Sequence, residues 1–412
     1  MLLAVGCAAA IVVLFYAEEN WRGKHAWEKY KRESEARGDR FEWSAVVPPP
    51  VADEQNFAAT PLFAELFPKP SGHPRLFDLP SSELRSVGGN WREARMEDFA
   101  VWRGFFPDEK PAAARPGPFI RREGQSSEGE ESSVPQKPFT STDVLAALSK
   151  HDAILREVSE TSRRPECRFP IRYEDNFAAR LPHLTQLRTL ARIYRLRALA
   201  ELDTRQIDAA FDDMLTGLRL ADRLKDEPIL ISFVVRMRMV DMLLQPVWEG
   251  MQTHRWSEKR LAQLQTELTR IDYFAGFSGV LRTERVLACQ TLLGIIRQPL
   301  WNRPFIIGGM TSDETADLDN ELFCMGLSPR GWLYQNAVSV DRFWIETVMQ
   351  EVNREARLVR PESVKRALQL NLDASSRPYQ MLVRVFVDGT AALPKKSAYC
   401  QKGVDEATVA CA

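Results

Sequence analysis

The strongest constraint on the fold of this chain lies near its start. Residues 2–17 (LLAVGCAAAIVVLFYA) form an uncharged and mostly apolar run. As a helix this run extends about 24 Å, slightly less than the hydrocarbon core of a bilayer. Tyr16 and Trp21 stand where aromatic side chains commonly mark the membrane–water interface. We therefore predict a transmembrane anchor over residues 1–21.

Three other interpretations of this run fit the residues less well. A cleaved signal peptide needs basic residues before its apolar run, and no Lys or Arg precedes this one. It also needs a small residue at the position that Phe15 occupies. A lipoprotein would be modified at Cys7, but the residues before Cys7 leave no room for an apolar region. A buried helix of a soluble domain remains an alternative. The sequence favours an uncleaved anchor.

The orientation of this anchor is harder to predict. Residues 18–40 contain seven Lys and Arg and six Asp and Glu. Basic residues alone would place this flank in the cytoplasm. If the N-terminus of the sequence is truncated, the basic residues that set the topology would be missing from it. On that ground we predict a single-pass protein of the inner membrane with a periplasmic body, against the charge count.

Composition divides the rest of the chain into further segments. Residues 22–105 form a juxtamembrane segment, helical at first, with the polyproline-type connector VPPPV at residues 47–51 and a second short helical unit at about residues 90–105. Residues 106–140 are rich in Pro, Gly, Ser and Glu, which predicts a flexible linker.

Residues 141–390 carry apolar side chains at helical spacing, which predicts an α-helical domain. The predicted helices cover residues 184–202, 207–221, 229–251, 257–268, 277–298, 331–357 and 361–372. Arg236, Arg238 and Asp241 interrupt the third helix and argue against a second membrane span. No stretch alternates in the manner of a strand, so we predict an all-α fold in which residues 391–412 begin a truncated C-terminal helix.

Residues 184–224 resemble one tetratricopeptide-type helical hairpin. Ala210, Met214 and Gly217 occupy the small-large-small positions of its second helix. No second copy follows at the spacing of about 34 residues that such arrays use. We therefore predict an irregular helical bundle or solenoid-like body.

Charge and cysteine content exclude several classes of protein. The chain has 55 Lys and Arg against 56 Asp and Glu, whereas nucleic-acid binding usually requires a basic excess. Its cysteines stand singly and lack the C-x-x-C spacing of zinc ribbons. Pairing of Cys400 with Cys411 is left open by the sequence.

No motif of known chemistry is present in the sequence. The histidines lie far apart and form no helical metal-binding pair; they are His25, His73, His151, His183 and His254. There is no nucleophile elbow, P-loop or dinucleotide-binding glycine motif. We therefore identify no catalytic residue, cofactor, metal or small-molecule ligand, and the sequence does not favour an enzyme.

The candidate interaction site is a stripe of Arg188, Arg192 and Arg195 on one predicted helix. It would bind an acidic or phosphorylated partner. The interpretation that we favour is structural: the stripe pairs with Asp208 and Asp212 across the hairpin, or stays solvated.

Both ends of the chain resemble an uncharacterised bacterial membrane-anchored family of Verrucomicrobia-like bacteria. The similar segments are residues 19–31 (ENWRGKHAWEKYK), 48–57 (PPPVADEQNF) and 398–412 (AYCQKGVDEATVACA). In that family the chain continues into a helix and a small pilin-like segment with a Tyr-Pro turn. The resemblance implies an uncleaved anchor, an envelope location, a chain truncated within its C-terminal helix, and no known catalytic residues.

These observations predict a membrane-anchored structural or protein-interaction protein of the bacterial cell envelope, with other envelope proteins as partners. One alternative is an enzyme with a carboxylate site between helices, which would show a deep pocket with two acidic residues, one of them desolvated. A second alternative, an assembly factor of a secretion or pilus-like system, rests on the resemblance alone.

Overall fold

The fold is that of a computed structural model. It describes residues 2–64, 66–67, 88–105, 138–310, 316–353, 355–360, 378–387, 390 and 392–412. Most of these residues are helical, which confirms the all-α prediction; the strands among them are β1 (Val352–Asn353) and β2 (Leu358–Val359), a short antiparallel pair. Residues 106–137 of the predicted linker and the predicted helix at 361–372 lie outside the described residues.

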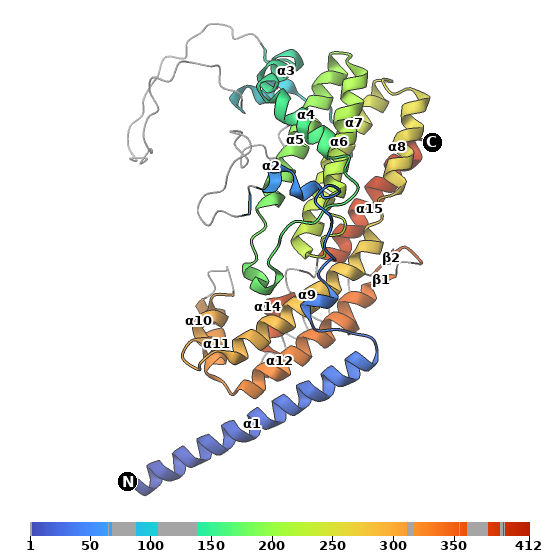
Figure 1. Cartoon of the computed structure of the whole chain (residues 1–412). Helices are drawn as coiled ribbons and strands as arrows, with labels where there is room; N and C mark the ends of the chain where they lie inside the picture. The colour runs from blue at the N-terminus through green and yellow to red at the C-terminus, as the bar shows by residue number, and fades with distance from the viewer. Residues whose placement is uncertain are drawn as a thin grey trace, which may run out of the picture.

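The first helix, α1 (Leu2–Ala36), is continuous and contains no proline. It joins the predicted anchor to the predicted juxtamembrane helix without a break at residue 21. Gly38 ends it with a φ of 97°, a backbone conformation that glycine adopts readily. By length and composition α1 can span a membrane. Its first half projects away from the other elements, which we call the body, and its second half lies along α12 (Arg330–Phe343) (Figure 1).

The centre of the body is formed by α5 (Pro182–Asp203), α6 (Ile207–Asp222) and α7 (Leu230–Gln252). The first two form the predicted helical hairpin, and α7 packs against both. Gly217 of α6 allows the close approach of α7, because an added Cβ would stand 2.5 Å from Leu243 Cδ2. The small residue in the predicted motif therefore receives a large residue from the next helix.

Shorter helices cover this centre. α3 (Ser141–Leu148) packs on α5 and begins with a capping box between Thr140 and Asp143. α4 (Asp152–Thr161) follows it. Other short elements are η1 (Trp43–Ala45), η2 (Phe57–Ala59), α2 (Pro61–Ala64), η3 (Trp91–Glu93), η4 (Phe99–Phe105), η5 (Ser149–His151) and η6 (Tyr173–Ala178). The predicted helical unit at residues 90–105 is thus two 3₁₀ segments rather than one helix.

A second layer lies between this centre and α1 (Figure 1). It contains α9 (Tyr273–Arg297) and α12, with α14 (Met381–Val387) packed on α12. α10 (Arg303–Gly308) and α11 (Ala316–Leu327) form a small pair at the end of this layer. The predicted helix at 331–357 ends at Phe343 and continues as a π turn, η7 (Trp344–Val348), and a 3₁₀ turn, η8 (Met349–Glu351).

The last helix, α15 (Leu393–Ala410), packs against α7, α8 (Glu258–Thr269) and α9. It is therefore an integral part of the body. Cys400 lies within α15 and Cys411 caps its end. Eleven residues of helix separate them by about 16 Å, which is beyond the reach of a disulfide. Both cysteines are free.

Candidate functional site

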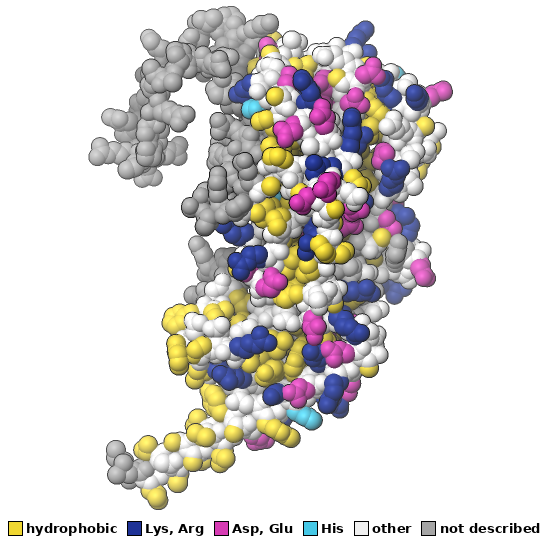
Figure 2. Space-filling model, viewed as in Figure 1, with side chains coloured by type: hydrophobic (Ala, Val, Ile, Leu, Met, Phe, Trp, Pro, Cys, Tyr) yellow, Lys and Arg dark blue, Asp and Glu magenta, His cyan; other side chains and the backbone are white. Residues whose placement is uncertain are grey.

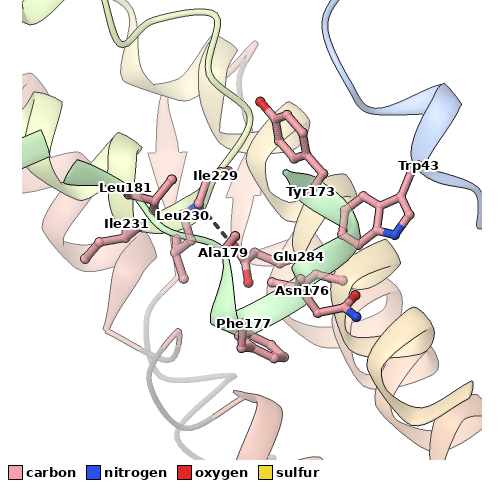
Figure 3. A pocket seen from close by; sticks show the side chains of 11 residues that line it. Trp43, Tyr173, Asn176, Phe177, Ala179, Leu181, Ile229, Leu230, Ile231 and Glu284 are labelled. Carbon is pink, nitrogen blue, oxygen red and sulfur yellow. Dashed lines mark hydrogen bonds between the residues drawn. The ribbon is translucent and has the colours of Figure 1, made fainter. Parts of the chain in front are cut away.

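An apolar cavity of about 210 Å³ lies between η6, the start of α7 and α9. Trp43, Phe177, Leu181 and Ile229 contribute to its walls (Figure 3). One carboxylate, that of Glu284, stands among these apolar side chains. The combination of a mostly apolar enclosure and a few polar groups is typical of a site for a small molecule.

Glu284 projects from the middle of α9 and is 6% exposed. Its Oε1 accepts a hydrogen bond from the Leu230 N–H at 3.0 Å. Leu230 is the first residue of α7, and the preceding Ile229 has no side-chain acceptor, so Glu284 satisfies a helix terminus that would otherwise lack a partner. Burial raises the pKa of Glu284 to about 7, although this hydrogen bond acts in the opposite direction.

One wall of the cavity has an unusual backbone. Asn176 adopts φ 53° and ψ −130° within η6, a conformation rare for any residue with a side chain. Its Oδ1 is buried without a hydrogen-bond partner, while its Nδ2 donates to the Glu174 carbonyl at 3.2 Å. Strained backbone and an unpaired buried acceptor beside a cavity are features that commonly accompany a binding site.

The two-carboxylate arrangement predicted for an enzyme is not present at this cavity, because Glu284 is its one acidic lining residue among those described. A pair of buried acids does occur elsewhere. Glu201 and Asp213 face each other across the α5–α6 hairpin, and burial raises the pKa of both. Arg197 lies between them, 2.8 Å from Asp213 Oδ2 and 3.6 Å from Glu201 Oε1. This cluster holds the hairpin together.

The predicted stripe residues lie on α5 but have different surroundings. Arg195 Nη2 is 2.6 Å from Glu97 Oε2, whose side chain is fully buried. Arg192 and Arg195 both line a second, polar cavity of about 440 Å³. Arg188 does not line it. Of the two acidic residues expected to pair with the stripe, Asp208 contacts Arg260 of α8. The role of the stripe stays a prediction.

Arg92 lines the polar cavity and contacts several other residues of its wall. Arg92 stacks between the rings of Trp91 and Tyr399, at 4.2 and 3.9 Å from their centroids. Its Nη2 also donates to Asp241 Oδ1 at 2.8 Å. These contacts fasten η3 to α7 and α15. We therefore interpret the cavity as a structural junction.

A buried histidine cluster also lacks the arrangement of a catalytic site. His183 lies between Phe67 and Phe169, and its Nε2 is 3.0 Å from Glu227 Oε2. The Ser232 hydroxyl donates to the same carboxylate and not to the imidazole. A nucleophile and its base must contact each other, so this set does not activate serine. Among the described residues, no group of three or more His, Cys, Asp and Glu side chains could hold a metal ion.

The contact between α1 and the body contains a buried polar network. Asp341 of α12 is completely buried; it accepts hydrogen bonds from Arg285 Nε at 2.8 Å and from the Tyr30 hydroxyl of α1 at 2.7 Å. Arg285 Nη1 also donates to Asp39, just after α1, at 3.1 Å. Burial opposes the charge of Arg285, but hydrogen bonds from its guanidinium to Asp341 raise its pKa on balance.

Two glycines bring the α1 and α12 backbones together in the same region. An added Cβ at Gly23 would overlap backbone atoms of Gly331, and one at Gly331 would overlap the carbonyl of Glu19. Asn20 Oδ1 accepts the Gly331 N–H at 3.0 Å, and Glu19 Oε2 accepts the Trp332 indole N–H at 2.8 Å. We call the contacts of residues 19–39 with α9 and α12 the α1 junction.

Comparison of the chain with protein-family models, curated proteins and solved structures gives no match. The resemblance to an envelope family, and the assembly-factor role that rests on it, stay predictions.

Sequence reasoning overlooked the polar groups that matter most in the structure. Glu284 stands three residues after Leu281 and four before Ala288, so it shares their buried helix face. Asp341 likewise follows Ala337 by four residues and is as buried as that residue. The sequence signal that could have identified both residues is an acidic side chain on the apolar face of an amphipathic helix.

Proposed function

We propose that this chain is a single-pass protein of the bacterial inner membrane that holds an all-α body at the periplasmic surface, where the body serves a structural or protein-binding role. One observation carries the proposal. The first half of α1 exposes its apolar side chains, such as Leu3 at 84% and Leu14 at 68%, while the second half is embedded in the α1 junction.

An apolar helix exposed in this way needs a covering medium. Each Leu, Val, Ile or Phe side chain left in water forgoes roughly 1.5 to 3 kcal/mol of burial free energy. A bilayer provides that burial, and the helix satisfies its own backbone hydrogen bonds there. Because α1 is continuous, its spanning half and its embedded half move as one element.

The anchor is tested by extraction of membranes at alkaline pH. We expect the full chain to stay in the membrane pellet. Replacement of Ala9 and Ile11 by Lys places charge near the centre of the apolar run at residues 2–17 and should release the chain to the supernatant. The matched control is Val409→Lys, because Val409 is 75% exposed on α15, and this variant should stay in the pellet. Release of the wild-type chain would refute the anchor.

The compartment is tested separately with fusions to the C-terminus of the full chain. Alkaline phosphatase folds to its active form outside the cytoplasm, and a cytoplasm-only fluorescent protein reports the opposite. Phosphatase activity without fluorescence is the expected result. Fluorescence without phosphatase activity would mean that the basic flank after the apolar run sets the topology, and the body would be cytoplasmic.

The protein-binding role is tested at the arginine stripe. A photoreactive amino acid at Arg188 should give a discrete cross-linked product in intact cells, because Arg188 is half-buried and does not line the polar cavity that contains Arg192 and Arg195. The same amino acid at Val409 is the control for non-specific capture. If both positions gave the same cross-linked products, or if Arg188 gave none, the hypothesis that the stripe is a docking site would be refuted.

A second candidate function is the binding of a small apolar molecule in the Glu284 cavity. The specific observation is a buried carboxyl group that has one backbone hydrogen bond and lines a mostly apolar cavity. A ligand with a short alkyl chain and an amino group would fill the cavity and place a cation beside Glu284, where burial strengthens the ion pair.

Calorimetric titration with short alkylamines and the alcohols of matched length tests this candidate. We expect amines to bind more tightly than alcohols, with the difference lost in Glu284→Gln. Glu33→Gln, at an exposed position on α1, should bind as the wild type does. Equal affinity of wild type and Glu284→Gln for the amines would exclude the site.

A further inference from the structure

The surface of the α10–α11 pair is apolar, although most of the body is not. Figure 2 shows hydrophobic side chains gathered there, next to those of the free half of α1. Trp301 is 75% exposed and Phe305 is 70% exposed. The other large apolar side chains exposed in this region are Leu300, Phe323 and Leu327. We call these five residues the α10–α11 patch.

The outward direction of the patch is fixed by packing beneath it. On α10, Pro304 and Ile307 are buried while Phe305 between them is exposed. Arg303 is buried and its Nη1 donates to the Ser328 carbonyl, which ties α10 to the end of α11. The rings of Phe305 and Phe323 meet edge to face at 5.8 Å. The patch is therefore one surface formed by α10, the turn that precedes it and α11.

The patch lies beside the point where α1 leaves the body. The Tyr16 hydroxyl donates to the Leu327 carbonyl at 2.7 Å. The Phe15 ring stands 6.3 Å from that of Trp332, near the start of α12. Figure 1 shows α10 and α11 alongside this part of α1. Tyr16 is the second-last residue of the apolar run of α1, so the patch stands at the level of the expected membrane surface.

We propose that the α10–α11 patch is a second membrane contact, in which Trp301, Phe305, Phe323 and Leu327 enter the interfacial layer of the bilayer that α1 crosses. This inference rests on the proposed membrane anchoring and adds an orientation of the body. Aromatic side chains favour the interfacial layer. The patch is also continuous with the exposed apolar surface of α1, which makes lipid the occupant.

The contact is hydrophobic rather than electrostatic. Between α10 and the apolar part of α11 the sequence contains five acidic residues from Asp313 to Glu321. Arg297 and Arg330 are the exposed basic residues near the patch. Acidic residues at this density oppose attraction to anionic headgroups, so we expect insertion into bilayers of zwitterionic phosphatidylcholine as well.

Two native cysteines make the inference testable in the full chain. Cys7 in α1 and Cys324 in α11 are exposed, whereas Cys289 and Cys411 are buried. Cys167 and Cys400 are half-buried and are replaced by Ala in every labelled variant. An environment-sensitive fluorophore on Cys324 in a Cys7→Ala variant reports the patch. The same fluorophore on Cys7 in a Cys324→Ala variant reports the anchor. A Val409→Cys variant that lacks both native sites reports the far side of the body.

Each labelled protein is reconstituted in phosphatidylcholine vesicles that contain lipids with nitroxide-labelled acyl chains, which quench nearby fluorophores. We expect quenching at Cys7 and Cys324 and none at Val409→Cys. Quenching at Cys7 alone would overturn the patch inference and leave the anchor intact. Absence of quenching at Cys7 would refute the anchor, and with it this inference.

A substitution tests whether the aromatic side chains cause the contact. Trp301→Ser with Phe305→Ser should abolish most of the quenching at Cys324 and leave that at Cys7 unchanged. Both side chains are exposed, so the fold should tolerate the change. Leu358→Ser is the matched control, since Leu358 is 44% exposed but lies in β2, and it should leave both signals unchanged. Persistent quenching at Cys324 in the double variant would refute the role of the aromatic residues.

Discussion

Glu284 connects α9 to the start of α7, and burial of its carboxyl group lowers the stability of the fold. Its carboxyl group supplies the hydrogen-bond acceptor that the first turn of α7 needs, and in return it leaves water for an apolar cavity. A carboxylate that served only as a helix cap would be more stable at the surface, where water solvates the charge. Burial of this group is therefore consistent with a ligand that contacts it.

The pH dependence of stability should reveal this cost. Burial raises the pKa of Glu284 from 4.5 to about 7 in the folded protein. Below pH 4.5 the group is protonated in both states and stability is complete. Between pH 4.5 and 7 the unfolded chain ionises first, so stability is lost by up to roughly 3 kcal/mol and then stays level. Glu284→Gln removes this loss.

Denaturant unfolding between pH 4 and 8, followed by tryptophan fluorescence, measures the effect. The stability of Glu284→Gln relative to the wild type should rise across this interval. Glu33→Gln, which changes an exposed carboxylate, should show no such trend. A difference between Glu284→Gln and wild type that is constant with pH would contradict the raised pKa.

The sequence predicts the burial of Glu284 but not its hydrogen-bond partner, because the two residues are far apart along the chain. Its position on the buried face of a predicted helix follows from the spacing to Leu281 and Ala288. Its partner, Leu230, is 54 residues away, and only the packing of α7 against α9 brings them together. Local periodicity predicts burial, but it contains no information on which terminus a buried carboxyl group will cap.

Among the elements, α1 depends on its contact with α12. The glycines Gly23 and Gly331 let the two backbones approach so closely that side chains cannot fit between them. The helical character of residues 2–36 was predictable from the apolar run and the helix formers that follow. The partner helix was not, because the contacts join residues 311 positions apart, such as Asn20 with Gly331.

Gly23→Ala should separate α1 from α12. The obstructing atoms belong to the Gly331 backbone and cannot rotate away, so we expect a loss of about 1 to 3 kcal/mol. Thermal unfolding in detergent gives the stability, and limited proteolysis of residues 37–60 reports release of α1. Gly279→Ala in α9 is the control: a Cβ there meets no atom within 4 Å, and alanine should be neutral or stabilising. Equal melting temperatures for the two variants would refute the close contact.

At the scale of the whole molecule, the buried polar network of the α1 junction connects α1 to two helices of the second layer. Asp341 receives hydrogen bonds from both α9 and α1, so movement of α9 would leave a buried carboxylate without its counterion, and movement of α1 would remove the hydrogen bond from Tyr30. Together with the α10–α11 patch, this network would fix the angle between the body and the membrane. The all-α class followed from the sequence, whereas this coupling depends on Tyr30, Arg285 and Asp341 meeting in three dimensions.

Asp341→Asn tests whether the network carries that connection. The substitution keeps the shape of the side chain but leaves Arg285 without its buried counterion, which costs roughly 3 to 5 kcal/mol. We expect a corresponding loss of stability in denaturant unfolding and faster proteolysis after α1. Tyr30→Phe removes one hydrogen bond and should cost only about 1 kcal/mol. Asp208→Asn breaks an ion pair whose carboxylate side chain is 95% exposed and should change stability little. If Asp341→Asn were no more damaging than Asp208→Asn, the anchor and the body would be joined by apolar packing alone, and a fixed orientation on the membrane would lose its structural basis.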